Sequence, residues 1–286
     1  MDLLGYNREK RGDEKRACQK IGDGDEGGRA PALLLAGLSP SQAKGEKMVR
    51  AKTAESPGMK GPRSPGDTRL HPLRAMRAFR ALQATGDTRQ VFVILRAMRG
   101  HALIRTFRRF AQSPTGKKVL AERRDLYPAL TDQEGLRKLP EGSLGRGYLA
   151  FMEEERLSAQ GLVQASESWE DDPMPPDIDL FRARMRELHD VSHVVTGYGR
   201  DPLGELCLLA FTYRQFGNLG RLLIVAMAWS RIPKPGRAAV FEAWRNGKRC
   251  AWLGDRDWES LLARPLAQVR RELAITLPVR YRPLVA

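Results

Sequence analysis

The sequence predicts an all-α protein, with one helical, bundle-like domain over residues 69–286 and a disordered tail over residues 1–68. From Leu70 onward, apolar residues recur every three or four positions, the period of a helix with one buried face. No stretch shows the sustained alternation of apolar and polar residues that is typical of a strand. The first 68 residues are rich in Gly, Pro, Ser, Lys and Glu, a composition that buries too little apolar surface to offset chain entropy.

The amino-acid composition limits the classes of protein to which this chain can belong. Hydrophobic residues make up 42% of the 286 residues, enough for a packed core. The three cysteines are widely spaced and predict neither a disulfide framework nor a paired-cysteine metal site, which fits a reducing compartment. We expect no transmembrane helix, because no run of about twenty apolar residues occurs. Acidic residues throughout the first thirty positions argue against a secretory signal and a mitochondrial presequence.

The positive charge is concentrated in one segment. The net charge is +15, and residues 70–124 hold 13 basic and 2 acidic side chains. This segment predicts a helix over residues 70–82, a second over residues 91–110 and a third that starts at Ser113-Pro114. Basic amphipathic helices favour an anionic membrane surface, although an ordinary arginine-rich face has the same pattern. Nucleic acid is not an expected partner, because no helix-turn-helix, zinc-finger or RNP motif accompanies the charge.

Further helices follow along the chain. Ser143 is expected to cap a helix that runs to about residue 157, and Ser158 a short one that ends at Glu167; an acidic, proline-containing loop then leads to residue 179. After a helix over residues 206–213, the run 222–229 is apolar on every side and is expected to be central. We expect a turn at residues 233–236, a helix over residues 238–248, a short helix near residues 252–262 and an extended tail from residue 277. In the helix over residues 238–248, the residues expected to point inward are Val240, Phe241 and Trp244.

The residues around His189 are the candidates for metal binding and catalysis. The run before it contains no proline or glycine, which predicts a helix through His193, so both imidazoles lie on one face and can reach one ion. Gly197 and Gly199 break this helix, and Asp201-Pro202 starts another, with Glu205 in its first turn. Two histidines and one glutamate around zinc leave a position open, the arrangement of a catalytic site. A core histidine pair that is hydrogen-bonded to Asp190 is the alternative.

Two motifs resemble the coenzyme Q biosynthesis family, the fourth member of the numbered Q-biosynthesis set. The first is His189-Asp190-x-x-His193-x11-Glu205, and the second is Leu139-Pro140-x-Gly142-Ser143-Leu144-Gly145-x-x-Tyr148. Thr196-Gly197 and Leu203-Gly204-Glu205 also fit the family. The resemblance covers about residues 70–286. One residue departs from the pattern: the family often has an aromatic residue before the second histidine, where this chain has Ser192.

The resemblance implies an all-helical, peripheral membrane protein that forms a homodimer and binds a metal, usually taken as Zn2+, through His189, Asp190, His193 and Glu205. It implies removal of the C1 carboxyl group from a polyprenylated 4-hydroxybenzoate and association with the other ubiquinone-biosynthesis enzymes. The expected location is the cytoplasmic face of a bacterial inner membrane, or the matrix side of the mitochondrial inner membrane in a eukaryote. The alternative within the same family is a non-catalytic scaffold or a prenyl-lipid-binding protein.

Several roles stay open at the level of sequence. Asp190 is expected to be catalytic, and it can serve as a ligand, as support for a ligand or as the acid that handles the proton at the ring carbon. Arg184, Arg186 and Arg200 are equal candidates to neutralise the substrate acid. An apolar groove for the prenyl tail would use Leu206, Leu209, Phe211 and residues 222–229, for which core packing is the alternative role. A His-Asp phosphohydrolase is disfavoured, because only His71 and His101 remain as further histidines.

Overall fold

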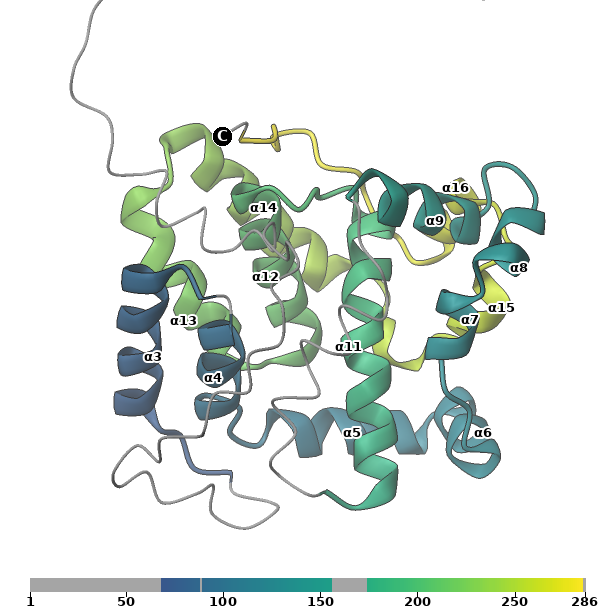
Figure 1. Cartoon of the computed structure of the whole chain (residues 1–286), viewed down its shortest axis with the longest axis horizontal. Coiled ribbons are helices and arrows are strands. Elements are labelled where there is room, and N and C mark those ends of the chain that lie inside the picture. Colours follow the sequence, from purple (N-terminus) through teal and green to yellow (C-terminus); the bar gives the residue numbers. More distant parts are fainter. Residues whose placement is uncertain (1–67, 88, 156–173, 285–286) are drawn as a thin grey trace, which may run out of the picture. The chain divides into compact units, whose positions relative to one another are not determined.

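Helices follow one another through all of the chain that the computed structural model describes, residues 68–87, 89–155 and 174–284 (Figure 1). These residues contain no strand, and one isolated bridge pairs Ser143 with Pro265. The predicted all-α fold is therefore confirmed. The predicted tail, apart from Thr68, and the short helix expected between Ser158 and Glu167 lie outside the described residues.

The first half of the described chain forms seven helices, two of which begin at the predicted caps Ser113 and Ser143. They are α3 (Pro72–Thr85), α4 (Arg89–Ala97), α5 (Ala102–Gln112), α6 (Pro114–Glu122), α7 (Tyr127–Thr131), α8 (Gln133–Lys138) and α9 (Leu144–Glu154). The Ser113 hydroxyl accepts the N–H of Gly116 at 2.9 Å, and the Ser143 hydroxyl accepts that of Arg146 at 3.3 Å. Each bond satisfies a backbone donor that the first turn of a helix leaves free.

The prediction of one helix over residues 91–110 is wrong. Helix α4 ends at Ala97 and α5 begins at Ala102. Between them Gly100 has φ 52°, a left-handed conformation that glycine adopts without strain. Buried residues continue on both sides of the break, at Ile94 and Phe110, so the apolar period extends across it and conceals it.

The second half contains the three longest of the described helices together with shorter ones. They are α11 (Pro176–Thr196), α12 (Pro202–Phe216), α13 (Leu219–Ala228), α14 (Lys234–Arg249), α15 (Trp258–Leu261) and α16 (Leu266–Glu272), with 3-10 turns η1 (Trp229–Arg231) and η2 (Leu253–Asp255). Helix α14 starts within the expected turn, because Pro233 stands at its N-cap and Pro235 lies in its first turn. Helices α7, α8 and α16 are short, and a run of five to seven residues shows too little periodicity to be predicted.

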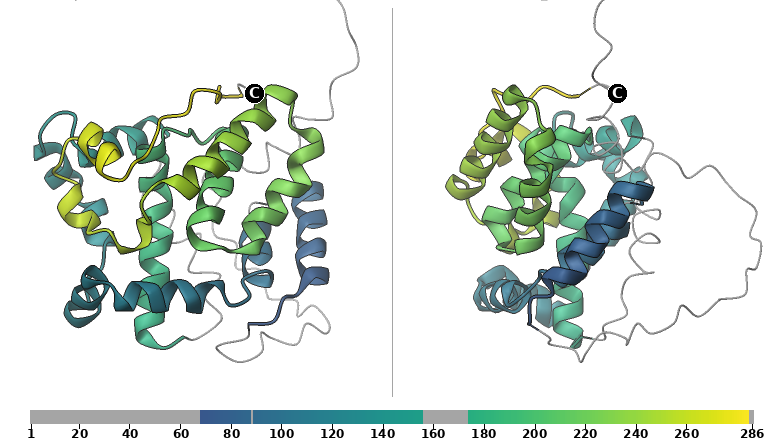
Figure 2. Two further views of the ribbon diagram at one scale, coloured as in Figure 1. Left: turned by 180° about the vertical axis from the view of Figure 1, so that it is seen from behind. Right: turned by 90° about the vertical axis from the view of Figure 1, so that its left-hand side faces the viewer.

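Helix α12 is the central helix of the described part. Residues 203–212 are all buried, and α12 packs against α11, α13, α14 and α5 (Figure 2). The contact with α14 is close because α14 presents small residues: a Cβ built on Gly247 would lie 2.3 Å from the carbonyl oxygen of Phe211. Small residues at such a crossing let two helix backbones approach each other, so the core depends on glycine at this position.

Two expectations about buried faces are therefore wrong. Helix α13 is not central, because it packs on α12 and α4 and leaves Leu222 39% exposed. Phe241 does not point inward: it is 54% exposed and its ring stacks on Trp244, with centroids 5.8 Å apart. Hydrophobicity predicts which large residues are suited to burial, but close packing of α14 on α12 is achieved by small ones.

Three features hold α11, whose C-terminal half contains the histidines. Gly197 ends the helix in a left-handed conformation with φ 75°. The Arg270 guanidinium donates to the carbonyl oxygens of Val195 and Val194, at 3.0 and 2.8 Å. Nearer the middle of α11, the buried Arg184 binds Glu259 through two hydrogen bonds, of 2.7 and 2.6 Å. These interactions fix the position of α11 independently of any ligand.

The extended C-terminal segment ties down the loop between α11 and α12. The Tyr281 hydroxyl donates to the Asp201 carboxylate and accepts the N–H of Gly199 at 3.0 Å. The N–H of Leu284 donates to Asp201 at 3.0 Å. Asp201 also caps α12 by accepting the N–H groups of Leu203 and Gly204, so a single carboxylate orders the loop and starts the helix.

Candidate metal centre

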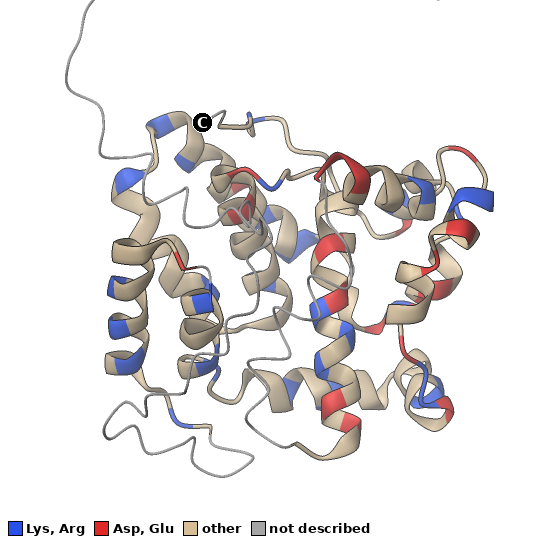
Figure 3. Ribbon diagram, viewed as in Figure 1, with Lys and Arg blue, Asp and Glu red and all other residues tan. Residues whose placement is uncertain are grey.

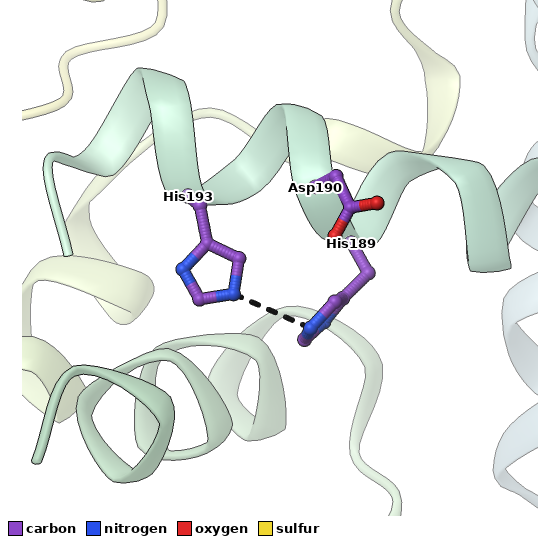
Figure 4. A group of neighbouring side chains, drawn as sticks. All are labelled: His189, Asp190 and His193. Carbon is purple, nitrogen blue, oxygen red and sulfur yellow. Dashed lines mark hydrogen bonds between the residues drawn. The ribbon is translucent and has the colours of Figure 1, made fainter. Parts of the chain in front are cut away.

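Helix α11 places His189, Asp190 and His193 together, as the spacing predicts (Figure 4). The two imidazole Nε2 atoms are 3.3 Å apart, and the rings meet edge to face with centroids 4.8 Å apart. One ligand atom of each residue, including a carboxylate oxygen of Asp190, lies within 4.8 Å of the others. Three donors of the kind that bind divalent metals therefore converge from one helix.

The backbone sets the tautomer of His193. Its Nδ1 lies 2.9 Å from the carbonyl oxygen of Tyr198, which can only accept, so Nδ1 carries the proton. The neutral ring then presents an unprotonated Nε2 toward His189. The Phe151 ring of α9 stacks on the His193 ring, with centroids 5.4 Å apart. This arrangement, a backbone acceptor on one nitrogen and a free lone pair on the other, is common among metal-binding histidines.

Glu205 reaches this pair from the first turn of α12. Its Oε1 lies 3.5 Å from His193 Nε2, and its Oε2 lies 3.7 Å from His189 Nε2. The glycine break and the Asp201 cap turn the chain so that the second helix points its first carboxylate back at the first helix. Glu205 thus lies beside the two imidazoles, while the group whose ligand atoms are all close to one another consists of His189, Asp190 and His193.

Charges within the site shift the titration of its members. Burial raises the pKa of Glu205, but the His193, His189 and Arg200 charges and the His193 hydrogen bond outweigh it, so that its pKa is lowered. Burial lowers the pKa of His193, yet the Glu205 charge and hydrogen bond and the Tyr198 carbonyl raise it above its usual value. For His189, burial dominates and its pKa is lowered despite Glu205. The two histidines therefore differ in basicity.

Arg200 is the arginine that the structure brings to the site. It is 7% exposed, and its Nε lies 3.7 Å from Glu205 Oε1. Arg184, also a candidate from the sequence, is occupied by Glu259, and Arg186 approaches Glu187 at 3.9 Å. The sequence motif alone did not distinguish these three.

The residues fit a divalent cation. The set offers two imidazole nitrogens and two carboxylates, the donors that zinc and similar ions bind. The Asp190 Oδ1 atom is buried and has no hydrogen-bond partner within the described residues, an arrangement that a bound cation would relieve. The His189 side chain is 38% exposed while His193 is buried, so the group is open on one side. An open side distinguishes a site that can admit substrate from a closed structural one.

Other expectations about the site have mixed outcomes. Leu206, Leu209 and Phe211 are buried in the core, which is the alternative role foreseen for them. Ser192, at the position where the family often has an aromatic residue, is buried, and its hydroxyl donates to the Leu188 carbonyl oxygen at 2.6 Å. The contribution of the Tyr198 carbonyl was not predicted, because a backbone acceptor leaves no mark on residue type.

Comparison with known proteins identifies the family. Residues 69–279 match the family described as Coenzyme Q (ubiquinone) biosynthesis protein Coq4. Ubiquinone biosynthesis protein COQ4 homolog, mitochondrial, from Danio rerio is 30% identical over 185 residues, which cover 63% of this chain and 66% of that protein. The corresponding protein from Homo sapiens is 28% identical over 193 residues, 63% of this chain and 68% of that protein.

The match to the Danio rerio protein thus spans just under two thirds of its length. A crystal structure from Nostoc punctiforme, of a protein assigned to ubiquinone biosynthesis, superposes on this fold with a TM-score of 0.55 at 22% identity. The superposition covers 72% of this chain and 98% of the Nostoc punctiforme chain, and it supports the fold. Because the family match covers most of the chain and includes all four site residues, the chain belongs to the Coq4 family of ubiquinone biosynthesis proteins.

Proposed function

We propose that this protein acts in ubiquinone biosynthesis as a metal-dependent lyase that removes the C1 carboxyl group from a polyprenylated 4-hydroxybenzoate. The observation that carries the proposal is the grouping of His189, Asp190 and His193 on α11, with Glu205 3.5 and 3.7 Å from the two imidazoles and His189 partly exposed. Family membership supports the pathway, and the donor set supports the class of chemistry.

His189, His193 and Glu205, with Asp190 as a further ligand, would hold the ion, which we propose to be Zn2+. When bound, it supplies a Lewis acid for the carboxylate or phenolate of the substrate. The reaction needs no oxidant: the bond between C1 and the carboxyl carbon breaks, carbon dioxide leaves, and C1 takes up one proton. We assign the delivery of that proton to Asp190, because a carboxylate has two oxygens and one remains for acid–base work.

A non-catalytic scaffold or prenyl-lipid carrier is the second candidate, and one observation favours it. Glu205 of α12 pairs with both histidines of α11, so the same group also braces two helices. The apolar residues expected to line a groove for the tail, Leu206, Leu209 and Phe211, are packed in the core. In such a role Glu205 and the two histidines would hold α11 and α12 together without catalysing a reaction.

The membrane is the proposed place of action. Among the described residues no helix is both long and apolar enough to cross a bilayer. Helix α3 instead exposes Arg74, Arg77 and Arg80 beside Met76 and Leu73, which is 77% exposed (Figure 3). Anionic lipid attracts such a face by about 1 kcal/mol per basic residue. We propose peripheral docking on the cytoplasmic face of a bacterial inner membrane, with the other ubiquinone-biosynthesis enzymes and a second copy of the chain as partners.

Metal analysis and a single substitution test the lyase. We expect the purified full chain to contain stoichiometric divalent metal, and to release carbon dioxide from a prenylated 4-hydroxybenzoate. Glu205→Ala should lose metal and release at least 100-fold less carbon dioxide while its circular dichroism stays helical, whereas the control Glu153→Ala, at an exposed pair with Arg137, should behave as wild type. Full activity in chelated protein would exclude the lyase, and retained partner binding without activity would support the scaffold.

A further inference from the structure

The Arg200 side chain is charged, buried and incompletely paired. It is 7% exposed, and its Nε and Nη1 atoms are buried without a hydrogen-bond acceptor among the described residues. The nearest carboxylate oxygen in an ion pair with it, Glu205 Oε1, lies 3.7 Å from Nε, which is too long for a hydrogen bond. Leaving charged donors unsatisfied in the interior is costly, so such an arrangement indicates a site that another group completes.

The position of Arg200 identifies where that group would lie. Glu205 Oε1 is 3.7 Å from the guanidinium and 3.5 Å from His193 Nε2, so Arg200 adjoins the metal centre. The open side of the centre is at His189. Because His189 approaches Glu205 Oε2 and Arg200 approaches Oε1, a ligand that enters beside His189 is separated from Arg200 by one carboxylate group.

Charge also indicates the nature of the ligand. Two carboxylates, Asp190 and Glu205, balance a divalent ion held with neutral histidines. The Arg200 charge is then left over, and a ligand with one negative charge makes the site neutral. A guanidinium binds a carboxylate through two parallel N–H groups, a geometry that phenols and alcohols do not offer. Water that occupies this space in the free protein would be displaced by the carboxylate oxygens.

We infer that Arg200 binds the carboxylate of the aromatic acid substrate and makes the site select acids over the corresponding phenols. This inference rests on the proposed function, since it names the substrate group that the metal centre would act on. It also chooses among the arginines of the motif region, because Arg184 is held by Glu259 and Arg186 lies toward Glu187. After carbon dioxide leaves, the product lacks the group that Arg200 binds, which favours its release.

Equilibrium binding of two matched ligands tests the inference. The probes are 3-geranyl-4-hydroxybenzoate and 2-geranylphenol, which differ only in the carboxylate, titrated into full-length protein whose metal content is matched between variants. Arg200→Gln should raise the Kd of the acid roughly 10- to 100-fold and leave that of the phenol within about threefold. Arg200→Lys should lie between, because it keeps the charge and loses the two-pronged geometry. The control Arg186→Gln should change neither.

The outcomes separate this inference from the lyase proposal. An unchanged acid Kd in both Arg200 variants, or an equal loss for acid and phenol, would overturn the inference and leave Arg200 only the role of orienting Glu205. If Arg200→Gln does not fold, the Arg200→Lys series decides in the same way. Wild-type protein that prefers the acid through Arg200 but releases no carbon dioxide would overturn the lyase and keep the inference. Decarboxylation with an unchanged KM in Arg200→Gln would overturn the inference and keep the lyase proposal.

Discussion

Replacing Glu205 by glutamine removes one negative charge from the middle of three basic groups. Its oxygens lie 3.5 Å from His193 Nε2, 3.7 Å from Arg200 Nε and 3.7 Å from His189 Nε2. At an effective dielectric constant of about 20, two unit charges 3.5 Å apart attract by about 5 kcal/mol, which the cost of burial opposes. Breaking a buried pair by removing one partner costs about 3–5 kcal/mol. In chelator-treated protein, Glu205→Gln should therefore lower the free energy of unfolding by about 3 kcal/mol at pH 6.

The size of this loss should depend on pH in a definite direction. The pKa of His193 is raised above its usual value by Glu205, against the effect of burial. A raised basic pKa contributes stability that is complete below about pH 6.5 and disappears as pH rises through the folded-state pKa. Once His193 has lost its proton, Glu205 keeps only the Arg200 charge as a counter-charge, so the same substitution should cost less at pH 9 than at pH 6.

Urea unfolding at pH 6 and pH 9 measures both values. Glu153→Gln serves as the control, because the Glu153–Arg137 pair is exposed and such pairs contribute at most about 1 kcal/mol. A loss for Glu205→Gln that is equal at the two pH values, or no larger than that of the control, would refute the assignment of Glu205 as the counter-charge of His193.

Three further predictions concern metal binding, helix packing and membrane docking. The apparent affinity for Zn2+, measured with chelator-buffered titrations, should keep rising past pH 6.5, because the proton on His193 leaves above its usual pKa; a plateau below pH 6 would contradict this. Gly247→Ala should destabilise the fold by about 1–3 kcal/mol in thermal unfolding, because its Cβ would meet the α12 backbone at 2.3 Å; an unchanged melting temperature would show that α14 can shift. Reversing Arg74, Arg77 and Arg80 to glutamate should weaken binding to vesicles of anionic lipid by at least 100-fold and leave neutral vesicles unaffected; unchanged sedimentation would mean that α3 is not the docking face.

Local patterns in the sequence were sufficient for the fold class, and they predicted the grouping of His189, Asp190 and His193. Helical period, caps and breaks act over one or two turns, so Ser113, Ser143, Asp201 and Gly197 mark where helices start and stop. The i, i+4 spacing and the glycine break then place the histidines and Glu205 together. The break at Gly100 was missed because both flanking helices bury the same apolar period.

Tertiary packing decided the rest, because it depends on which surfaces meet and not on residue type. The close contact of α14 with α12 is made by Gly247 rather than by the large Phe241, and α12 rather than α13 is central. The same holds at the site: three arginines of the motif region are equivalent in the sequence, and only in the folded chain does Glu259 bind one of them and leave Arg200 buried beside Glu205. Proximity to the site is a property of position in three dimensions, and Arg200 differs from Arg184 and Arg186 because it alone of the three pairs with Glu205 among the described residues.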